Sequence, residues 1–94
     1  MDRIERNRLW TRYRLTPEQY DRMWLAQGRA CALCRATVGR FVVDHDHACC
    51  PGTRTCGLCV RGILCQSCNV RIGLFEELPF VAIMAYLQRK GAPI

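Results

Sequence analysis

Two Cys-x-x-Cys pairs constrain the fold of this chain more than any other feature. The first pair is Cys31 and Cys34, the second is Cys65 and Cys68, and thirty residues separate them. This spacing is typical of a structural zinc site with four thiolate ligands, because each pair presents two sulfurs to one ion. Unrelated thiols or redox pairs are the alternative, but a redox pair requires a βαβ context that the sequence lacks. We therefore predict a zinc ion that ties two distant segments together.

Four further cysteines lie between the two pairs. They are Cys49, Cys50, Cys56 and Cys59, in a polar segment over residues 47–59 that reads as a loop. Such a loop has little to order it, and a second zinc bound by the four thiolates would do so. Two alternatives stay open, namely a site of three cysteines and one histidine, and free reduced thiols.

Length and the N-terminal segment bear on how these cysteines are used. A domain of 94 residues has a small hydrophobic core and commonly needs metals or disulfides for stability. The chain opens with charged residues instead of the apolar core of a signal peptide, and no apolar run is long enough to span a membrane. We expect a soluble, cytoplasmic protein with no membrane partner, in which cysteine pairs bind zinc and do not form disulfides.

Arginine supplies nearly all of the positive charge. The formal net charge is +6, and thirteen of the fourteen basic residues are Arg. The guanidinium fork matches phosphate oxygens, so this bias favours a phosphate-containing partner. Each zinc held by four thiolates carries a net charge of about −2, so two such sites reduce the surplus to roughly +2. DNA binding therefore depends on where the arginines cluster and not on their total.

The hydrophobic pattern predicts an α+β fold in a single domain over residues 1–94. Thr16 and Gln19 form a capping box at a helix start, and Gly28 suits the residue after that helix. The expected elements are a basic helix over 3–14, a helix over 17–27, strands over 38–44 and 60–64, a short helix after Cys68 that ends at Gly73, and a last helix that begins near Pro79.

The last predicted helix carries an apolar stripe along one face. Its residues follow the i, i+3, i+4, i+7 spacing. We expect the small core to cover this stripe, and we expect Glu76 and Glu77 to stabilise the positive N-terminal end of the helix. Since little surface then remains for an interface, we expect a mainly monomeric chain, with a dimer as the alternative. The stripe consists of Phe80, Ile83, Met84 and Leu87.

The stretch from Phe41 to His47 changes abruptly from strand-forming to ionisable residues. It reads Phe-Val-Val-Asp-His-Asp-His. Side chains of a regular strand alternate between faces, so Asp44 and Asp46 would point one way and His45 and His47 the other. A polar strand end that leads into a loop is the alternative to a functional site. The cysteine pairs on either side favour the functional site.

Several short motifs now stand in a definite order along the chain. They are Cys31-x-x-Cys34, Val43-Asp44-His45-Asp46-His47, Val60-Arg61-Gly62-Ile63-Leu64-Cys65 and Cys68-Asn69, preceded by Arg14-Leu15-Thr16-Pro17-Glu18-Gln19-Tyr20 and Ala26-Gln27-Gly28. This ordered set resembles the phage recombination endonuclease VII family, a branch of the His-Me finger (HNH, ββα-metal) nucleases. The resemblance covers roughly residues 12–88.

The resemblance implies a small zinc-bound ββα-metal domain with flanking helices, encoded by a phage or a bacterium, that cleaves DNA. In it, Asp44 and Asn69 hold a catalytic Mg²⁺ or Mn²⁺, His45 is the general base, and His47 supports the phosphate or the metal. Regular alternation would separate Asp44 from His45, so either the strand is distorted there or His47 has a larger role. Two features depart from the best-known family member. That protein lacks the loop cysteines, and it has a long segment after the last helix that this sequence does not show.

The same residue types suit phosphodiester hydrolysis on chemical grounds. The reaction needs a base for water, charge neutralisation on the phosphate oxygens and a stabilised 3′ leaving group. Carboxylate and amide oxygens suit Mg²⁺, and histidine is a suitable base near neutral pH. A non-catalytic zinc-stabilised DNA-binding module and a dimeric Holliday-junction resolvase are the rival functions. The candidate phosphate contacts, each of which could instead face solvent, are Arg61, Arg71, Arg12 and Arg14.

Overall fold

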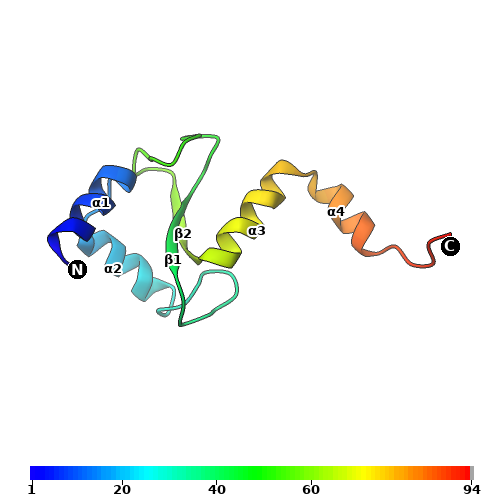
Figure 1. Cartoon of the computed structure of the whole chain (residues 1–94), viewed down its shortest axis with the longest axis horizontal. Coiled ribbons are helices and arrows are strands. Elements are labelled where there is room, and N and C mark those ends of the chain that lie inside the picture. Colours follow the sequence, from blue (N-terminus) through cyan, green and yellow to red (C-terminus); the bar gives the residue numbers. More distant parts are fainter. Residues whose placement is uncertain (94) are drawn as a thin grey trace.

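The computed structural model describes residues 1–93, which form four helices and one two-stranded sheet (Figure 1). Two helices precede the sheet and two follow it. The predicted α+β class is therefore confirmed. The elements are α1 (Arg3–Tyr13), α2 (Pro17–Ala26), β1 (Phe41–His45), β2 (Val60–Cys65), α3 (Gln66–Glu77) and α4 (Phe80–Leu87).

The two strands form an antiparallel hairpin with an irregularity near the end of β1. Asp44 pairs with Gly62, but the next pair is His45 with Val60, so Arg61 has no partner in the ladder. This is a β-bulge, a feature that redirects side chains and is frequent beside active sites. The extra residue, Arg61, belongs to β2, and the irregularity lies opposite the Asp44–His45 step at which the sequence analysis considered a distorted strand.

Helix α3 follows β2 without an intervening loop, which completes a ββα unit. The N–H of Gln66 donates to the carbonyl of Arg40 (2.9 Å) and so fixes the start of the helix beside the start of β1. The prediction that Gly73 ends this helix is wrong, because α3 continues to Glu77. A glycine inside a helix costs only about 1 kcal/mol, and the added turn brings Glu76 to an arginine of β2. Glu76 therefore belongs to α3 and does not serve the start of α4.

One core cluster joins the first two helices to the hairpin. Leu9, Leu15 and Val43 are each less than 8% exposed and pack together. The predicted capping box orients α2 for this contact. The Thr16 side chain accepts from the N–H of Gln19 (3.2 Å), and the Gln19 side chain accepts from the N–H of Thr16 (2.8 Å).

The second core cluster is built around cysteines. Cys31, Leu64 and Cys68 are buried together where the hairpin meets α3. Beside them, the side chain of Gln27 accepts from the N–H of Ile63 (2.8 Å) and donates to its carbonyl (2.9 Å), as a neighbouring strand would. Because two members of this small cluster are candidate zinc ligands, metal binding and core formation are linked here.

Helix α4 extends away from both clusters (Figure 1). Phe80, Met84 and Leu87 are 62%, 39% and 68% exposed, so the prediction that the core covers the apolar stripe is wrong. The ring of Phe80 instead lies 6.1 Å from that of Phe75 at the end of α3. The radius of gyration is 16.3 Å, against roughly 12 Å for a compact domain of this length. Across residues 1–93, no helix combines the length and apolar character that crossing a membrane requires.

Candidate active site and metal centres

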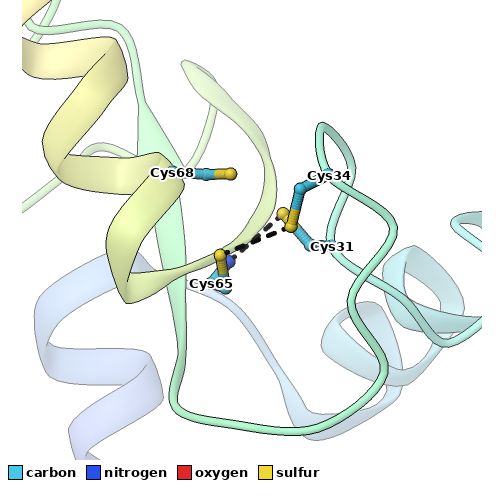
Figure 2. Close-up of side chains that lie close together, drawn as sticks. All are labelled: Cys31, Cys34, Cys65 and Cys68. Carbon is cyan, nitrogen blue, oxygen red and sulfur yellow. Dashed lines mark hydrogen bonds between the residues drawn. The ribbon is translucent and has the colours of Figure 1, made fainter.

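The two Cys-x-x-Cys pairs meet beside the start of α3 (Figure 2). Their sulfurs lie within 4.8 Å of one another, and Cys34 Sγ is 3.7 Å from Cys65 Sγ. A zinc ion with four sulfur ligands at about 2.3 Å requires sulfur separations of about 3.8 Å, so the geometry fits zinc. All eight cysteines, which lie within the described residues, are free of disulfides. We call Cys31, Cys34, Cys65 and Cys68 the core tetrad.

Backbone amides prepare one thiol of the core tetrad for metal binding. Burial alone would raise the pKa of Cys31, but N–H groups of Cys65, Cys34 and Leu33 surround its sulfur and lower the pKa to about 6. Cys68 has the opposite environment, because burial and then the neighbouring thiols raise its pKa to about 12. A thiolate therefore forms first at Cys31, and a bound cation is needed before Cys68 loses its proton near neutral pH.

The four cysteines of the connecting loop form a second cluster, the loop tetrad, which consists of Cys49, Cys50, Cys56 and Cys59. Cys56 Sγ is 3.9 Å from Cys49 Sγ and 4.0 Å from Cys59 Sγ, which again fits zinc. None of the four is buried, unlike Cys31 and Cys68 of the core tetrad. The group contains no histidine, so the four-cysteine arrangement is the one that the structure has.

The four predicted active-site side chains line one cavity of about 260 Å³. Asp44 and His45 come from the end of β1, His47 from the loop, and Asn69 from the first turn of α3. A cavity where ionisable side chains from several elements converge is a candidate binding or active site. Other residues that line it are Arg12, Tyr13, Arg40, Val42, Val43, Gly52, Thr53 and Gln66.

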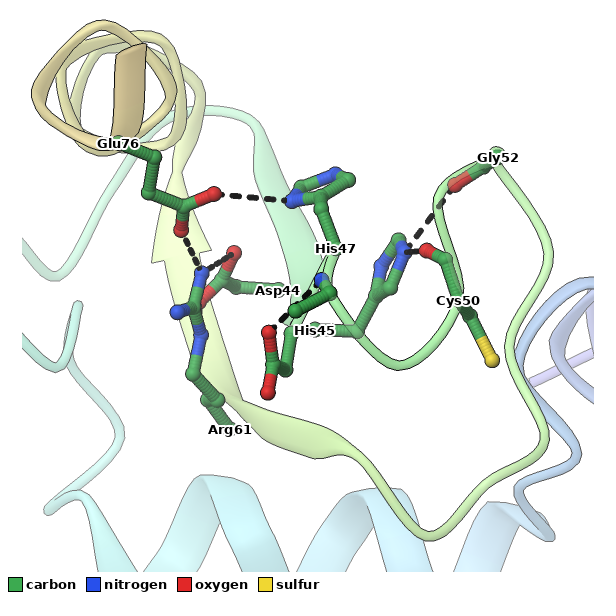
Figure 3. Close-up of polar contacts among 9 residues, drawn as sticks. Asp44, His45, His47, Cys50, Gly52, Arg61 and Glu76 are labelled. Atoms are coloured by element: carbon green, nitrogen blue, oxygen red, sulfur yellow. Dashed lines mark hydrogen bonds and ion pairs between the residues drawn. The ribbon is translucent and has the colours of Figure 1, made fainter. Parts of the chain in front are cut away.

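His45 is held by two main-chain carbonyls (Figure 3). Its Nε2 lies 2.9 Å from the oxygen of Cys50 and 3.1 Å from that of Gly52. A carbonyl oxygen can only accept, so Nε2 carries the ring proton and Nδ1 keeps its lone pair in the neutral imidazole. His45 is 5% exposed, and its ring centroid is 4.3 Å from that of His47. The fold thus selects the tautomer that accepts a proton at Nδ1.

A network of charged groups surrounds the other side chains of the site (Figure 3). Arg61 donates to both carboxylate oxygens of Asp44, at 2.8 and 3.1 Å, and to Glu76 as well. Glu76 in turn lies 3.3 Å from Nδ1 of His47. The hydrogen bonds to Asp44 and then to Glu76 raise the pKa of Arg61, and the Arg61 guanidinium lowers the pKa of Glu76. The bulge, α3 and the loop are therefore linked electrostatically at this point.

The four arginines that we predicted to contact phosphate have different surroundings. Arg12 lines the cavity that contains His45. Arg14 lies with its guanidinium 5.3 Å from the ring centroid of Trp10 and does not line that cavity. Arg61 is engaged by two carboxylates, and Arg71 lines other hollows along α3. Of the four, only Arg12 lines the cavity, while Arg61 is part of the site through its hydrogen bonds to Asp44 and Glu76.

Three residues of the site were missed by the sequence analysis. Arg40 lines the cavity from just before β1, but an exposed arginine before a strand carries no distinguishing signal. Gly52 contributes its main-chain carbonyl, a group that every residue has, so the sequence gives no signal for it. Glu76 had a usable signal, because it follows Asn69 by seven residues and so lies two turns further along the same helix face. Our expectation that Gly73 ends the helix hid this relation.

Residues 6–89 match the model of a family described as recombination endonuclease VII. The chain belongs to the recombination endonuclease VII family. This confirms the resemblance drawn from the cysteine pairs and the Asp-His-Asp-His stretch.

A curated relative supports the membership of the recombination endonuclease VII family. The chain is similar to the Gene 59 protein of Mycobacterium phage D29, with 37% identity over 65 residues. The match covers 66% of this chain and 34% of the relative, so the chain spans about a third of that protein's length. No solved structure matches the chain significantly. The family is named for an endonuclease, an enzyme that hydrolyses phosphodiester bonds within a nucleic acid.

Proposed function

We propose that this chain is a metal-dependent DNA endonuclease in which His45 is the general base. The observation that carries the proposal is the pair of carbonyls on Nε2, which leaves Nδ1 as the basic nitrogen of a histidine that lines the same cavity as Asp44 and Asn69. A general base must hold a lone pair in a fixed direction, and a buried imidazole with one nitrogen anchored meets that need. Histidine also titrates closer to neutral pH than other side chains.

His45 would take a proton from the attacking water at Nδ1. The two carbonyls on Nε2 keep the ring from rotating and also stabilise the imidazolium that results, because the Nε2–H of a cation donates more strongly than that of a neutral ring. The contact with the His47 ring restricts the remaining motion. The water then reacts with the phosphorus while the 3′ oxygen leaves.

Asp44 and Asn69 are the residues that would hold a Mg²⁺ or Mn²⁺ ion. A carboxylate and a side-chain amide are hard oxygen donors, and both line the cavity. Each Asp44 oxygen accepts one hydrogen bond from Arg61 and keeps a further lone pair for a ligand. When bound, such an ion neutralises phosphate charge and stabilises the departing 3′ oxygen.

His47 and the arginines would position the DNA backbone. Glu76 orients His47 through Nδ1, so its Nε2 remains available for a phosphate oxygen. Arg12 and Arg40 line the cavity and would contact neighbouring phosphates, whereas Arg61 must leave a carboxylate to do so. Arg14 and Arg71 would serve a longer DNA segment beyond the cavity. Such contacts predict binding that weakens steeply with salt.

The biological setting follows from the relative. Its source is a mycobacterial phage, which supports a phage-encoded nuclease that acts on DNA inside the infected cell. We propose a mainly monomeric enzyme that nicks DNA with weak sequence preference. A non-catalytic zinc-bound DNA-binding module and a dimeric junction resolvase are the alternatives that an experiment must separate.

Product analysis on matched substrates tests the proposal. The purified zinc-loaded chain is incubated with a linear duplex and with a four-way junction that contains the same sequence, with Mg²⁺, with Mn²⁺ or with neither ion added, and without a chelator that would remove the structural zinc. We expect incisions on both substrates that require the divalent ion. No cleavage under any condition, with DNA binding retained, would favour the binding module. Paired symmetric incisions on the junction alone would favour the resolvase.

A further inference from the structure

The loop tetrad lies next to the residue that we assign as general base. Cys50 supplies one sulfur of the tetrad, and its own carbonyl oxygen is 2.9 Å from His45 Nε2. Gly52, two residues further along the same loop, supplies the second carbonyl at 3.1 Å. The backbone that fixes His45 is therefore the backbone of a candidate metal centre (Figure 3).

Little else holds this part of the loop in place. Of the loop residues 46–59, all of which the structure describes, Thr55 alone is buried. Thr55 anchors the far side of the loop to the end of α1. Its N–H donates to the main-chain carbonyl of Arg12 (2.7 Å), and its hydroxyl donates to the main-chain carbonyl of Tyr13 (3.0 Å). The turn before Cys50 depends on the N–H groups of Cys49 and Cys50, which donate to the carbonyl of Asp46 (3.1 Å each). The second anchor holds Cys50 through its N–H, but neither anchor contacts Pro51 or Gly52, which follow it.

The four sulfurs supply the missing constraint. They join residues 49 and 50 to residues 56 and 59, so a bound ion would clamp the loop on both sides of Pro51 and Gly52. Cys59 is further tied to the strand end, since its carbonyl accepts from the N–H of Asp46 (2.9 Å). A cation with four thiolate ligands is rigid in a way that an exposed peptide loop of this length is not.

We propose that the loop tetrad is a zinc centre that positions His45 by holding the carbonyls of Cys50 and Gly52 against its Nε2. This inference rests on the proposed function only in calling His45 the general base. The centre acts on His45 only through these two carbonyls and touches neither water nor phosphate, so its cysteines are positioning residues. Partners that orient metal-binding histidines typically change metal affinity or activity by about 10- to 100-fold, and we expect an effect of that size on a histidine held in the same way.

The two tetrads then have different tasks. Cys31 and Cys68 belong to a core cluster, so loss of the core zinc removes packing that the fold needs. The loop tetrad lies outside both core clusters, and loss of its zinc should leave the hairpin and helices intact. Metal loss from the loop would therefore weaken the enzyme without unfolding it.

Histidine NMR at one fixed pH tests the proposal. The chain has two histidines, so the ¹⁵N signals of His45 are assigned by comparison with His47→Ala. In zinc-loaded wild type, we expect the His45 nitrogens to show a single tautomer protonated at Nε2. In Cys56→Ser, we expect one fewer zinc per chain, an amide spectrum that is otherwise native, and His45 signals that shift to a mixture of tautomers. Leu58→Ser is the matched control, because Leu58 lies in the same loop, is 94% exposed and binds no metal.

Three outcomes would overturn the proposal. The first is a His45 signature in Cys56→Ser that matches wild type after the loop zinc is lost. The second is a wild-type chain that holds zinc in the core tetrad alone. The third is global unfolding of Cys56→Ser, which would make the loop centre a part of the fold. None of these readouts uses DNA. If the wild type failed to cleave DNA, the proposed function would be wrong, but the NMR test would still decide whether the loop zinc positions His45.

Discussion

Arg61 donates two hydrogen bonds, of 2.8 and 3.1 Å, to the carboxylate of Asp44. Arg61 is also the residue of β2 that has no partner in the β ladder. The bulge therefore places the guanidinium over a carboxylate whose side chain is 7% exposed. A buried carboxylate needs such a partner, because burial of an unpaired charge is strongly unfavourable. The relation links a backbone irregularity to the position of a carboxylate that we assign to metal binding.

Arg61→Ala should destabilise the fold. The change leaves Asp44 buried and unpaired, and since Arg61 is itself 40% exposed, we expect a loss of about 1–3 kcal/mol in the free energy of unfolding. Chemical denaturation at neutral pH measures it. Arg71→Ala is the control, because Arg71 is exposed and forms no ion pair among residues 1–93, so its effect should stay within about 0.5 kcal/mol. Equal effects of the two variants would contradict the account.

Glu76 should contribute a pH-dependent part of the stability. The Arg61 guanidinium lowers the pKa of Glu76 below its ordinary value, so the ion pair contributes fully to stability at any pH above the pKa that Glu76 has in the unfolded chain. The contribution is lost as pH falls through the lower pKa of the folded state. We expect the difference in unfolding free energy between wild type and Glu76→Gln to shrink between neutral pH and about pH 3. Glu77→Gln, one residue away, should show no such trend.

The chain should contain about two zinc ions, one for each tetrad. Elemental analysis of protein prepared without added metal measures this. Cys65→Ser should prevent folding, because structural zinc contributes more than about 10 kcal/mol to small domains. Ser67→Ala is the control, since Ser67 lies between Cys65 and Cys68 but is exposed and no member of the tetrad. A folded, zinc-free Cys65→Ser protein would remove the link between metal and core.

The exposed face of α4 leads to a prediction about its role. Leu87→Ser should change the free energy of unfolding by less than about 0.5 kcal/mol, since Leu87 is 68% exposed. Leu9→Ala, at a residue only 6% exposed, should cost about 2–5 kcal/mol. A large loss for Leu87→Ser would mean that α4 is covered by a second copy of the chain. Light scattering at micromolar concentration measures this directly, and a monomer stays our prediction even though the reason first given for it is wrong.

Local signals in the sequence predicted which elements form and in what order, although β1 begins at Phe41 and not at residue 38, and α3 begins at Gln66 and not after Cys68. The capping box of Thr16 and Gln19 and the spacing of the cysteine pairs act over a few residues or through a single ion, so their outcome does not depend on distant packing. The extent of α3 was not predictable from Gly73, because what extends the helix is the pairing of Glu76 with Arg61. That pairing exists only once the hairpin has formed.

The residue types of the candidate site were predictable from the sequence, but the hydrogen bonds that orient them were not. Asp44, His45, His47 and Asn69 do line one cavity, as their pattern suggested. The carbonyls that orient His45 belong to backbone, whose direction the sequence does not encode locally. The apolar stripe of α4 shows a further limit of the sequence. Apolar periodicity predicts that one helix face is buried, but it does not say which part of a protein covers that face.

DNA cleavage by His45→Ala tests the central claim most directly. The variant is compared with wild type and with His47→Ala on a nicked-product assay with Mg²⁺ or Mn²⁺, and DNA affinity is measured in parallel by fluorescence anisotropy without Mg²⁺, Mn²⁺ or a chelator, so that the structural zinc is retained. Since a positioned base typically contributes about 10²- to 10⁴-fold, we predict that His45→Ala loses at least about 100-fold in cleavage rate while zinc content and DNA affinity stay at the wild-type level. His45→Ala that cleaves at the wild-type rate while His47→Ala does not would contradict the assignment and transfer the role of base to His47.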